Sequence, residues 1–280
     1  MEKTILVPID FSEQSLIALK QSYNLAKLSH SSITILNVIK TGSGFWGVFS
    51  DDDKKEYELK VEKKLKETAK NIADETGVDV HIITRKGNAY EEIMRVANYL
   101  KPMLIVMGTS SGAFIARKIV GSRTLHVIKT SDYPVLSIKG NPPLNGCRNI
   151  LLPIDASKHT TQKIDFAIEL AKIFNSKITV VTAISKSNIS KIETVNATLL
   201  EISSKIRSEK IICNTDFIYA EDDKFKMAKA LLKYAHKVKA DIVTIMTQQE
   251  RDISKFFLGS LAQNIIFSFN IPVLTITPKK

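Results

Sequence analysis

An internal duplication constrains the fold of this chain more than any other feature. The segment Thr4–Asp10 (TILVPID) recurs as Asn149–Asp155 (NILLPID). Four more segments recur in the same order: Ser32–Val38 as Lys177–Ala183, Met103–Met107 as Asp241–Met246, Gly121-Ser122 as Gly259-Ser260, and Tyr133–Ile138 as Ile271–Ile276. Five ordered matches indicate that one domain occurs twice.

The length of the chain agrees with two domains. It has 280 residues, so each half is long enough for a hydrophobic core of its own. A cluster of Gly, Pro and Asn at Gly140–Gly146 is typical of a linker. We predict domains at 1–140 and 147–280, packed against each other because the linker is short.

Short apolar runs alternate with helical patterns in each half. The runs that predict strands in the first half are Ile5–Ile9, Ile33–Val38, Val78–Ile83, Met103–Met107 and Val135–Ile138. Between the first two, helical spacing predicts a face made of Leu16, Leu19, Tyr23 and Ala26. Alternation of this kind predicts an α/β fold, in which each repeat is a doubly wound, mostly parallel five-stranded sheet flanked by helices.

Ligands of such sheets bind beyond the carboxyl ends of the strands, where the strand order reverses. Small residues there let backbone amides approach an anion, and a helix that begins with Gly-Ser offers free N–H groups and a positive dipole. Asp10 has the chemistry to accept hydrogen bonds from a ribose or an adenine amino group. The candidate site residues are Pro8, Asp10, Val38, Met107, Gly108, Ser110, Ser111, Gly112, Gly121, Ser122, Arg123 and Thr124.

These residues resemble the universal stress protein family, in a tandem form that covers nearly the whole chain twice. The family ends its first strand in Pro-x-Asp, as in Pro8-Ile9-Asp10, and carries Gly, two residues, Gly, nine residues, then Gly-Ser or Gly-Thr. The resemblance implies the fold of the adenine nucleotide α-hydrolase-like proteins and a stress-response protein that binds ATP, with or without Mg²⁺. Asp10 and the Val38 backbone would hold adenosine, and Gly108–Ser111 and Gly121–Thr124 would wrap the phosphates.

The resemblance also implies partners. Family members commonly pair through their last strands, so Val135–Ile138 and Val273–Ile276 are the expected seam of an internal pseudo-dimer. Two chains would then be able to form a homodimer.

The chain departs from the family pattern in two places. Ser111 stands where the second glycine is expected, which costs about 1 kcal/mol or more if that position needs a positive φ, unless Gly112 takes the turn. In the second half Thr247–Asp252 contains no glycine, and the carboxylates of Glu250 and Asp252 would repel phosphate. We therefore expect a degenerate second site.

Other interpretations stay open. Asp10 would also serve to cap the next helix or to bind loop amides, and Gly121-Ser122 would also serve only to begin a helix. A scaffold that binds no nucleotide is the alternative function. Enzymatic activity is uncertain and at most a slow ATPase, because no nucleophile elbow, P-loop lysine or catalytic base is recognisable. The aromatic segment Thr41–Ser50 has two interpretations, a loop folded on its own domain or a lid or partner contact.

Composition limits the remaining classes. The formal net charge is +11, but Lys and Arg alternate with Asp and Glu, so we do not expect nucleic-acid binding. The N-terminus has no secretory pattern and apolar runs are too short to span a bilayer, which predicts a cytoplasmic protein without membrane contact. Neither the five histidines nor Cys147 and Cys213 have metal-ligand spacing, so the thiols are expected to be structural and no metal site is expected.

Overall fold

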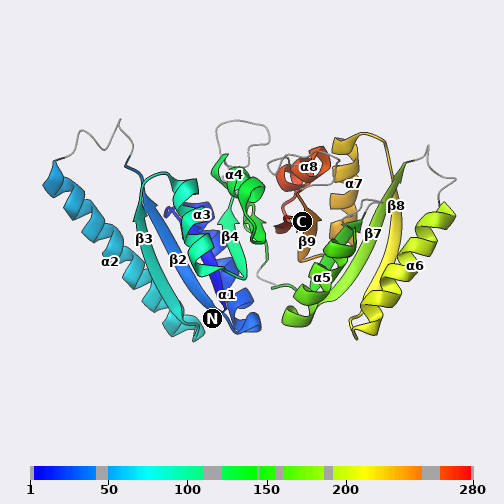
Figure 1. Ribbon diagram of the computed structural model, residues 1–280, viewed down its shortest axis with the longest axis horizontal. Helices are drawn as coiled ribbons and strands as arrows, with labels where there is room; N and C mark the ends of the chain where they lie inside the picture. The colour runs from blue at the N-terminus through cyan, green and yellow to red at the C-terminus, as the bar shows by residue number, and fades with distance from the viewer. Residues whose placement is uncertain are drawn as a thin grey trace.

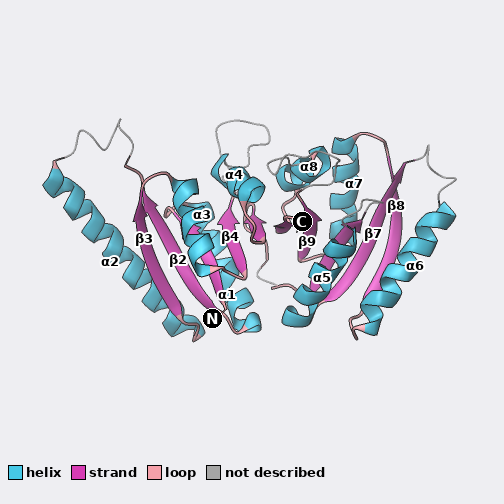
Figure 2. Ribbon diagram, viewed as in Figure 1, coloured by secondary structure: helices cyan, strands magenta, loops and turns pink. Residues whose placement is uncertain are grey.

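The protein is a three-layer structure in which helices cover both faces of one long twisted sheet (Figures 1 and 2). The computed structural model describes residues 3–41, 50–109, 122–143, 146–154, 160–185, 192–247 and 259–278. The segment Thr41–Ser50, apart from its two end residues, lies outside the described residues, so neither interpretation of its aromatic side chains is tested.

The elements follow the same order in both repeats. The first repeat contains β1 (Thr4–Ile9), α1 (Glu13–Ser29), β2 (Ser32–Ile39), α2 (Asp51–Thr76), β3 (Val80–Lys86), α3 (Ala89–Leu100), β4 (Leu104–Gly108), α4 (Ser122–Thr130) and β5 (Val135–Ile138). The second contains β6 (Asn149–Ile154), α5 (Thr160–Phe174), β7 (Lys177–Ser185), α6 (Ile192–Ser208), β8 (Cys213–Ala220), α7 (Lys224–Lys237), β9 (Ile242–Met246), α8 (Ser260–Ser268) and β10 (Val273–Ile276).

The sheet topology confirms the predicted fold class. Strand order is β3-β2-β1-β4-β5 in the first repeat and β8-β7-β6-β9-β10 in the second. Within each repeat the neighbouring strands are parallel, for example β1 with β2 in the register Ile5↔Ile33. The order reverses between β1 and β4, so the carboxyl ends of these strands mark the switch point of the first repeat.

Burial explains why the strands are continuous apolar runs. One hydrophobic cluster joins the sheet to α1, α2, α5 and α6, and a second joins the opposite face to α3, α4, α7 and α8. A strand such as β1 is therefore buried on both sides: Ile5 belongs to the first cluster and Leu6 to the second, and both are 0% exposed. Such strands do not alternate polar and apolar residues, because both of their faces are buried.

Local sequence signals fix the helix ends. Asn88 caps α3 by accepting a hydrogen bond from the Tyr90 amide, and Gly77 ends α2 in the left-handed region at φ 69°. The predicted inner face of α1 is partly wrong, because Leu16 is exposed. The buried face is formed instead by small residues among larger ones, including Ser15, Ala18 and Ser22, which let α1 lie close to the sheet.

The two repeats join through their last strands. β5 and β10 pair antiparallel in the register Leu136↔Leu274, at the seam that the family resemblance predicts. Two hydrogen bonds at corresponding positions cross this seam: Ser137 Oγ donates to the Val273 carbonyl at 3.1 Å and Thr275 Oγ1 donates to the Val135 carbonyl at 3.0 Å. The pairing makes ten strands into one sheet and leaves neither β5 nor β10 as an open edge.

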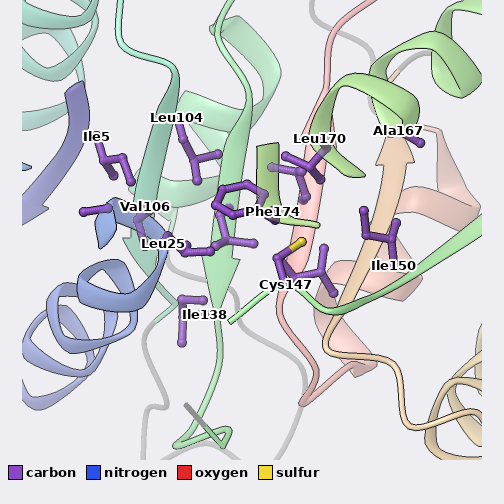
Figure 3. Close-up of a cluster of buried hydrophobic side chains, with 14 of the residues drawn as sticks. Ile5, Leu25, Leu104, Val106, Ile138, Cys147, Ile150, Ala167, Leu170 and Phe174 are labelled. Atoms are coloured by element: carbon purple, nitrogen blue, oxygen red, sulfur yellow. The ribbon is translucent and has the colours of Figure 1, made fainter. Parts of the chain in front are cut away.

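A shared core supports the seam. Side chains from both repeats meet in one cluster, with Leu25 of α1 and Ile138 of β5 from the first repeat near Cys147 and Phe174 of the second (Figure 3). The linker is held against α1 by a hydrogen bond of 2.8 Å that the Gln21 side chain donates to the Pro142 carbonyl. The repeats are thus packed against each other, as the short linker predicts.

The seam gives a first prediction. Leu136 is 1% exposed and pairs with Leu274, so Leu136→Ala should lower the free energy of unfolding by about 2–5 kcal/mol through lost burial and a residual cavity. Urea unfolding followed by circular dichroism measures this change. Leu59→Ala, at a residue 66% exposed on α2, should change it by less than about 0.5 kcal/mol. Equal effects of the two variants would contradict a buried seam.

Candidate functional site

A pocket lies at the carboxyl ends of β1, β2 and β4. Its volume is about 380 Å³, within the range of small-molecule sites. It brings together seven of the predicted site residues: Pro8, Asp10, Val38, Met107, Gly108, Arg123 and Thr124. The prediction missed the other seven lining residues, which are Ile9, Ser12, Gln14, Ser15, Leu36, Ala89 and Ile93. We call this cavity the switch-point pocket.

The other predicted site residues are not tested by the structure. Ser110, Ser111, Gly112 and Gly121 lie outside the described residues, as does the side chain of Ser122. Helix α4 begins at Ser122, which confirms that a helix starts directly after Gly121.

Close packing of α1 against β4 shapes one end of the pocket. A Cβ atom on Gly108 would lie 2.3 Å from the Gln14 carbonyl oxygen and 3.0 Å from the Ser15 amide nitrogen, so only glycine allows this approach. The Gly108 carbonyl also accepts a hydrogen bond from Thr124 Oγ1 at 3.1 Å. The amino-terminal turns of α1 and α4 are therefore both anchored on the last residue of β4.

Asp10 forms the polar centre of the pocket. Its carboxylate accepts hydrogen bonds from the Ser12 amide at 3.2 Å and the Ser12 hydroxyl at 2.5 Å, and it pairs with Arg123 Nη1 at 3.1 Å. The N-cap of α1 is Ser12, so Asp10 binds the capping residue. Asp10 therefore does bind a loop amide, that of Ser12, as one interpretation of the sequence expected. Its ion pair with Arg123 is a further contact that the sequence did not reveal.

Electrostatics keep Asp10 ionised. Burial by itself would raise the pKa of this carboxyl, but hydrogen bonds from Ser12, Arg123 and Ser15 outweigh burial and hold the pKa below its ordinary value of 3.8. Both side chains of the ion pair remain about half exposed, at 46% for Arg123 and 48% for Asp10. An incoming ligand can therefore reach either charge.

Part of the pocket wall is apolar. Leu36 and Val38 come from β2, Met107 from β4 and Ile93 from α3. An apolar slot that ends at one carboxylate and one guanidinium suits a ligand with a flat apolar part and an anionic part.

The corresponding region of the second repeat is built differently. Ladder registers equate Gly108 with Met246, because these residues pair with Ile138 and Ile276 respectively. Met246 is 1% exposed, so a buried side chain stands where the first repeat has no side chain. Lys163 corresponds to Ala18, is fully buried, and donates from Nζ to the Pro153 carbonyl at 3.2 Å. Asp155 and 248–252 lie outside the described residues.

A larger cleft of about 930 Å³ lies between the repeats. It is lined by the linker and by residues that precede β6, β9 and β10, such as Arg148, Asp241 and Pro272. It lies at the amino ends of these strands, whereas ligands of doubly wound sheets bind beyond the carboxyl ends. We therefore consider the smaller cavity the better candidate for a specific ligand.

Neither cysteine lines the switch-point pocket. Cys147 and Cys213 are free and buried, and burial raises the pKa of Cys147 to about 12. Within the described ranges no cluster of three or more His, Cys, Asp or Glu could hold a metal ion. Over the same part of the chain no helix has both the length and the apolar character needed to cross a membrane.

Comparison with known proteins identifies the family. The model of the universal stress protein family matches twice, at residues 1–139 and 146–277, so the chain belongs to this family as a tandem member. A universal stress protein of Methanocaldococcus jannaschii is 32% identical over 144 residues, which cover 49% of this chain and 82% of the relative. Universal stress protein YxiE of Bacillus subtilis is 31% identical over 149 residues, covering 50% of this chain and all of the relative.

A solved structure has the fold along almost the whole length of the chain. A universal stress protein from Archaeoglobus fulgidus superposes with a TM-score of 0.77 at 21% identity, covering 98% of this chain and 96% of that one. At 21% identity this match concerns the fold alone, and it covers both repeats.

Gly108 gives a second prediction. Gly108→Ala should lower the free energy of unfolding by about 1–3 kcal/mol, because the new methyl group must push the backbone of α1 away from β4. Gly259→Ala is the steric control, since a Cβ there meets nothing within 4 Å; it should cost at most about 1 kcal/mol, because Ala is a poorer N-cap of α8 than Gly. Chemical denaturation compares the two, and a Gly108→Ala protein as stable as the control would refute the packing argument.

Asp10 gives a third prediction. Removing the guanidinium with Arg123→Ala should raise the pKa of Asp10 toward 3.8, as measured by carboxyl-carbon NMR titration. Because the folded-state pKa is lowered, the Asp10 contacts stabilise the fold fully above the unfolded pKa and lose this contribution as pH falls through the folded pKa. A pKa of Asp10 that does not change in Arg123→Ala would mean that the pair does not persist in solution.

Proposed function

We propose that the first repeat binds an adenine nucleotide, with ATP as the expected ligand, and that the protein acts in stress response through this binding. The observation that carries the proposal is the switch-point pocket, in which an apolar slot, the Asp10 carboxylate and the Arg123 guanidinium meet at the strand reversal. A purine is flat and largely apolar, a ribose donates hydroxyl hydrogen bonds, and phosphates are anions. The three parts of the pocket suit these three parts of the ligand.

Each residue then has a role in the proposal. Val38, Ile93 and Met107 enclose the base, with the Val38 backbone available for hydrogen bonding. Asp10 accepts a hydrogen bond from a ribose hydroxyl, and Arg123 binds phosphate with charge-assisted hydrogen bonds. The resemblance assigns the remaining phosphate contacts to Gly108, to Ser110–Gly112 and to Gly121–Thr124, with Mg²⁺ as an expected companion of the phosphates.

Binding in this form exchanges partners at the ion pair. Arg123 leaves Asp10 for a phosphate, and Asp10 turns from the guanidinium to the ribose while it keeps its bonds to Ser12. Asp10 then keeps hydrogen-bond donors but loses its cationic partner, so the contacts between Arg123 and phosphate must outweigh the ion pair that is lost. Since Arg123 lies in the first turn of α4, the exchange also couples the ligand to that helix.

The second repeat is proposed to have a structural role. Met246 and Lys163 occupy positions that are Gly108 and Ala18 in the first repeat, and neither change favours a nucleotide at the corresponding place. In this proposal 1–140 and 147–280 are two domains that form an internal pseudo-dimer through β5 and β10. A homodimer of chains and a cytoplasmic location stay predictions from the sequence.

The alternative function is a scaffold that binds no nucleotide. Its support is that Asp10 and Arg123 already satisfy each other and that the second repeat lacks the glycine of β4. The two functions differ in one measurable property, which is nucleotide binding by the folded protein. Catalysis is not part of either proposal, and a slow ATPase stays the upper limit expected.

Calorimetric titration with ATP and Mg²⁺, after removal of any co-purified ligand, tests the proposal. We expect about one ATP per chain. Asp10→Ala should weaken binding about tenfold, because a buried ribose hydroxyl loses its acceptor. The matched control is Asp155→Ala at the corresponding position of the second repeat, which should bind ATP like the unmodified protein.

Two other titration results would contradict a single nucleotide site in the first repeat. Two ATP per chain, with Asp155→Ala losing one, would show that the second repeat binds nucleotide. No binding at millimolar ATP by a folded protein would rule out ATP as the ligand of the first repeat and favour the scaffold.

A further inference from the structure

The ion pair of Asp10 and Arg123 separates two cavities. A second cavity of about 330 Å³ lies beside the switch-point pocket, and Asp10, Val38 and Arg123 line both. We call it the side pocket; its other walls include Phe11 after β1, Lys40 after β2, and Lys54 and Tyr57 on α2. The two charged side chains, 3.1 Å apart, therefore form part of the wall that the cavities share.

Aromatic side chains distinguish the side pocket. Phe11 and Tyr57 both line it. Phe11 has a left-handed backbone at φ 59°, which is uncommon for a bulky residue, and Lys64 Nζ lies 4.3 Å from the centre of its ring. Backbone strain of this kind clusters at ligand sites, where the surrounding structure maintains it. The strain fixes the direction of Phe11 between Asp10 and the helix cap Ser12.

Three cationic side chains and two carboxylates line the side pocket: Lys40, Lys54 and Arg123 with Asp10 and Asp53. Asp53 is held by Ser50 in the capping box of α2, and Lys54 pairs with Asp51 at 3.1 Å. Lys40 forms no ion pair with any residue in the described ranges and is exposed. Its ammonium group is therefore available to a phosphate that enters between Arg123 and the aromatic side chains.

We propose that the two pockets bind the two ends of one ligand, a dinucleotide whose phosphate bridge takes the place of Asp10 at Arg123. This inference rests on the proposed function, because one adenosine occupies the switch-point pocket. The second base stacks against Tyr57 and Phe11, and Lys40 binds the bridge.

Each cavity is large enough for one part of a ligand. Each volume lies near the lower limit of about 300 Å³ for ligand sites. A mononucleotide in the switch-point pocket leaves the aromatic walls of the side pocket exposed to water. A dinucleotide covers both.

The test compares ATP with diadenosine tetraphosphate by calorimetric titration of the full chain. Stacking of one base on aromatic side chains changes affinity by roughly 5- to 100-fold, so we expect the dinucleotide to bind more tightly than ATP by a factor in this range. Tyr57→Ala should remove most of this preference. Tyr57 is 51% exposed, so the variant should remain folded.

The control is Tyr99→Ala, a tyrosine that is 79% exposed on α3 and lines neither pocket, which should keep the preference for the dinucleotide. If ATP binds and the dinucleotide binds no more tightly, or if Tyr57→Ala leaves the preference intact, the inference is wrong while the proposed function stands. If the dinucleotide binds and ATP does not, the mononucleotide function is wrong and the two-pocket ligand stands. If neither binds, both are wrong.

Discussion

The contact between the backbone of α1 and Gly108 is the constraint on which the first repeat depends most. It sets the distance between the first helix and β4, since a Cβ at Gly108 would collide with the Gln14 carbonyl. With α1 so close, Ser12 caps the helix beside Asp10, and the Gly108 carbonyl anchors Thr124 at the start of α4. One missing side chain therefore brings together the carboxylate, the guanidinium and the apolar slot.

The two repeats share a backbone plan and differ in chemistry. Strand order, parallel pairing and the hydrogen bonds at the seam correspond between them. Yet Met246 fills the position of Gly108, and the buried Lys163 replaces Ala18. A duplicated fold needs both halves to bury the seam and the shared core, but it needs only one half to keep an open pocket.

Much of the fold could be predicted from the sequence, because strands buried on both faces must be continuously apolar and helix ends carry local signals. The strand Ile5–Ile9, the cap Asn88 and the end of α2 at Gly77 are examples. The inner face of α1 was harder to predict. Small residues such as Ser15 and Ala18 lie on the buried face, whereas the large apolar Leu16 is exposed. The Asp10–Arg123 pair joins residues 113 positions apart and depends on how α4 is oriented, so no local pattern reveals it.

A crystal structure of the protein with a non-hydrolysable ATP analogue tests the central claim most directly. The account predicts the purine between Val38, Ile93 and Met107 of the first repeat, with Arg123 moved from Asp10 to a phosphate and nothing bound beside Met246. A nucleotide in the second repeat, or a nucleotide bound elsewhere while the Asp10–Arg123 pair stays closed, would contradict it.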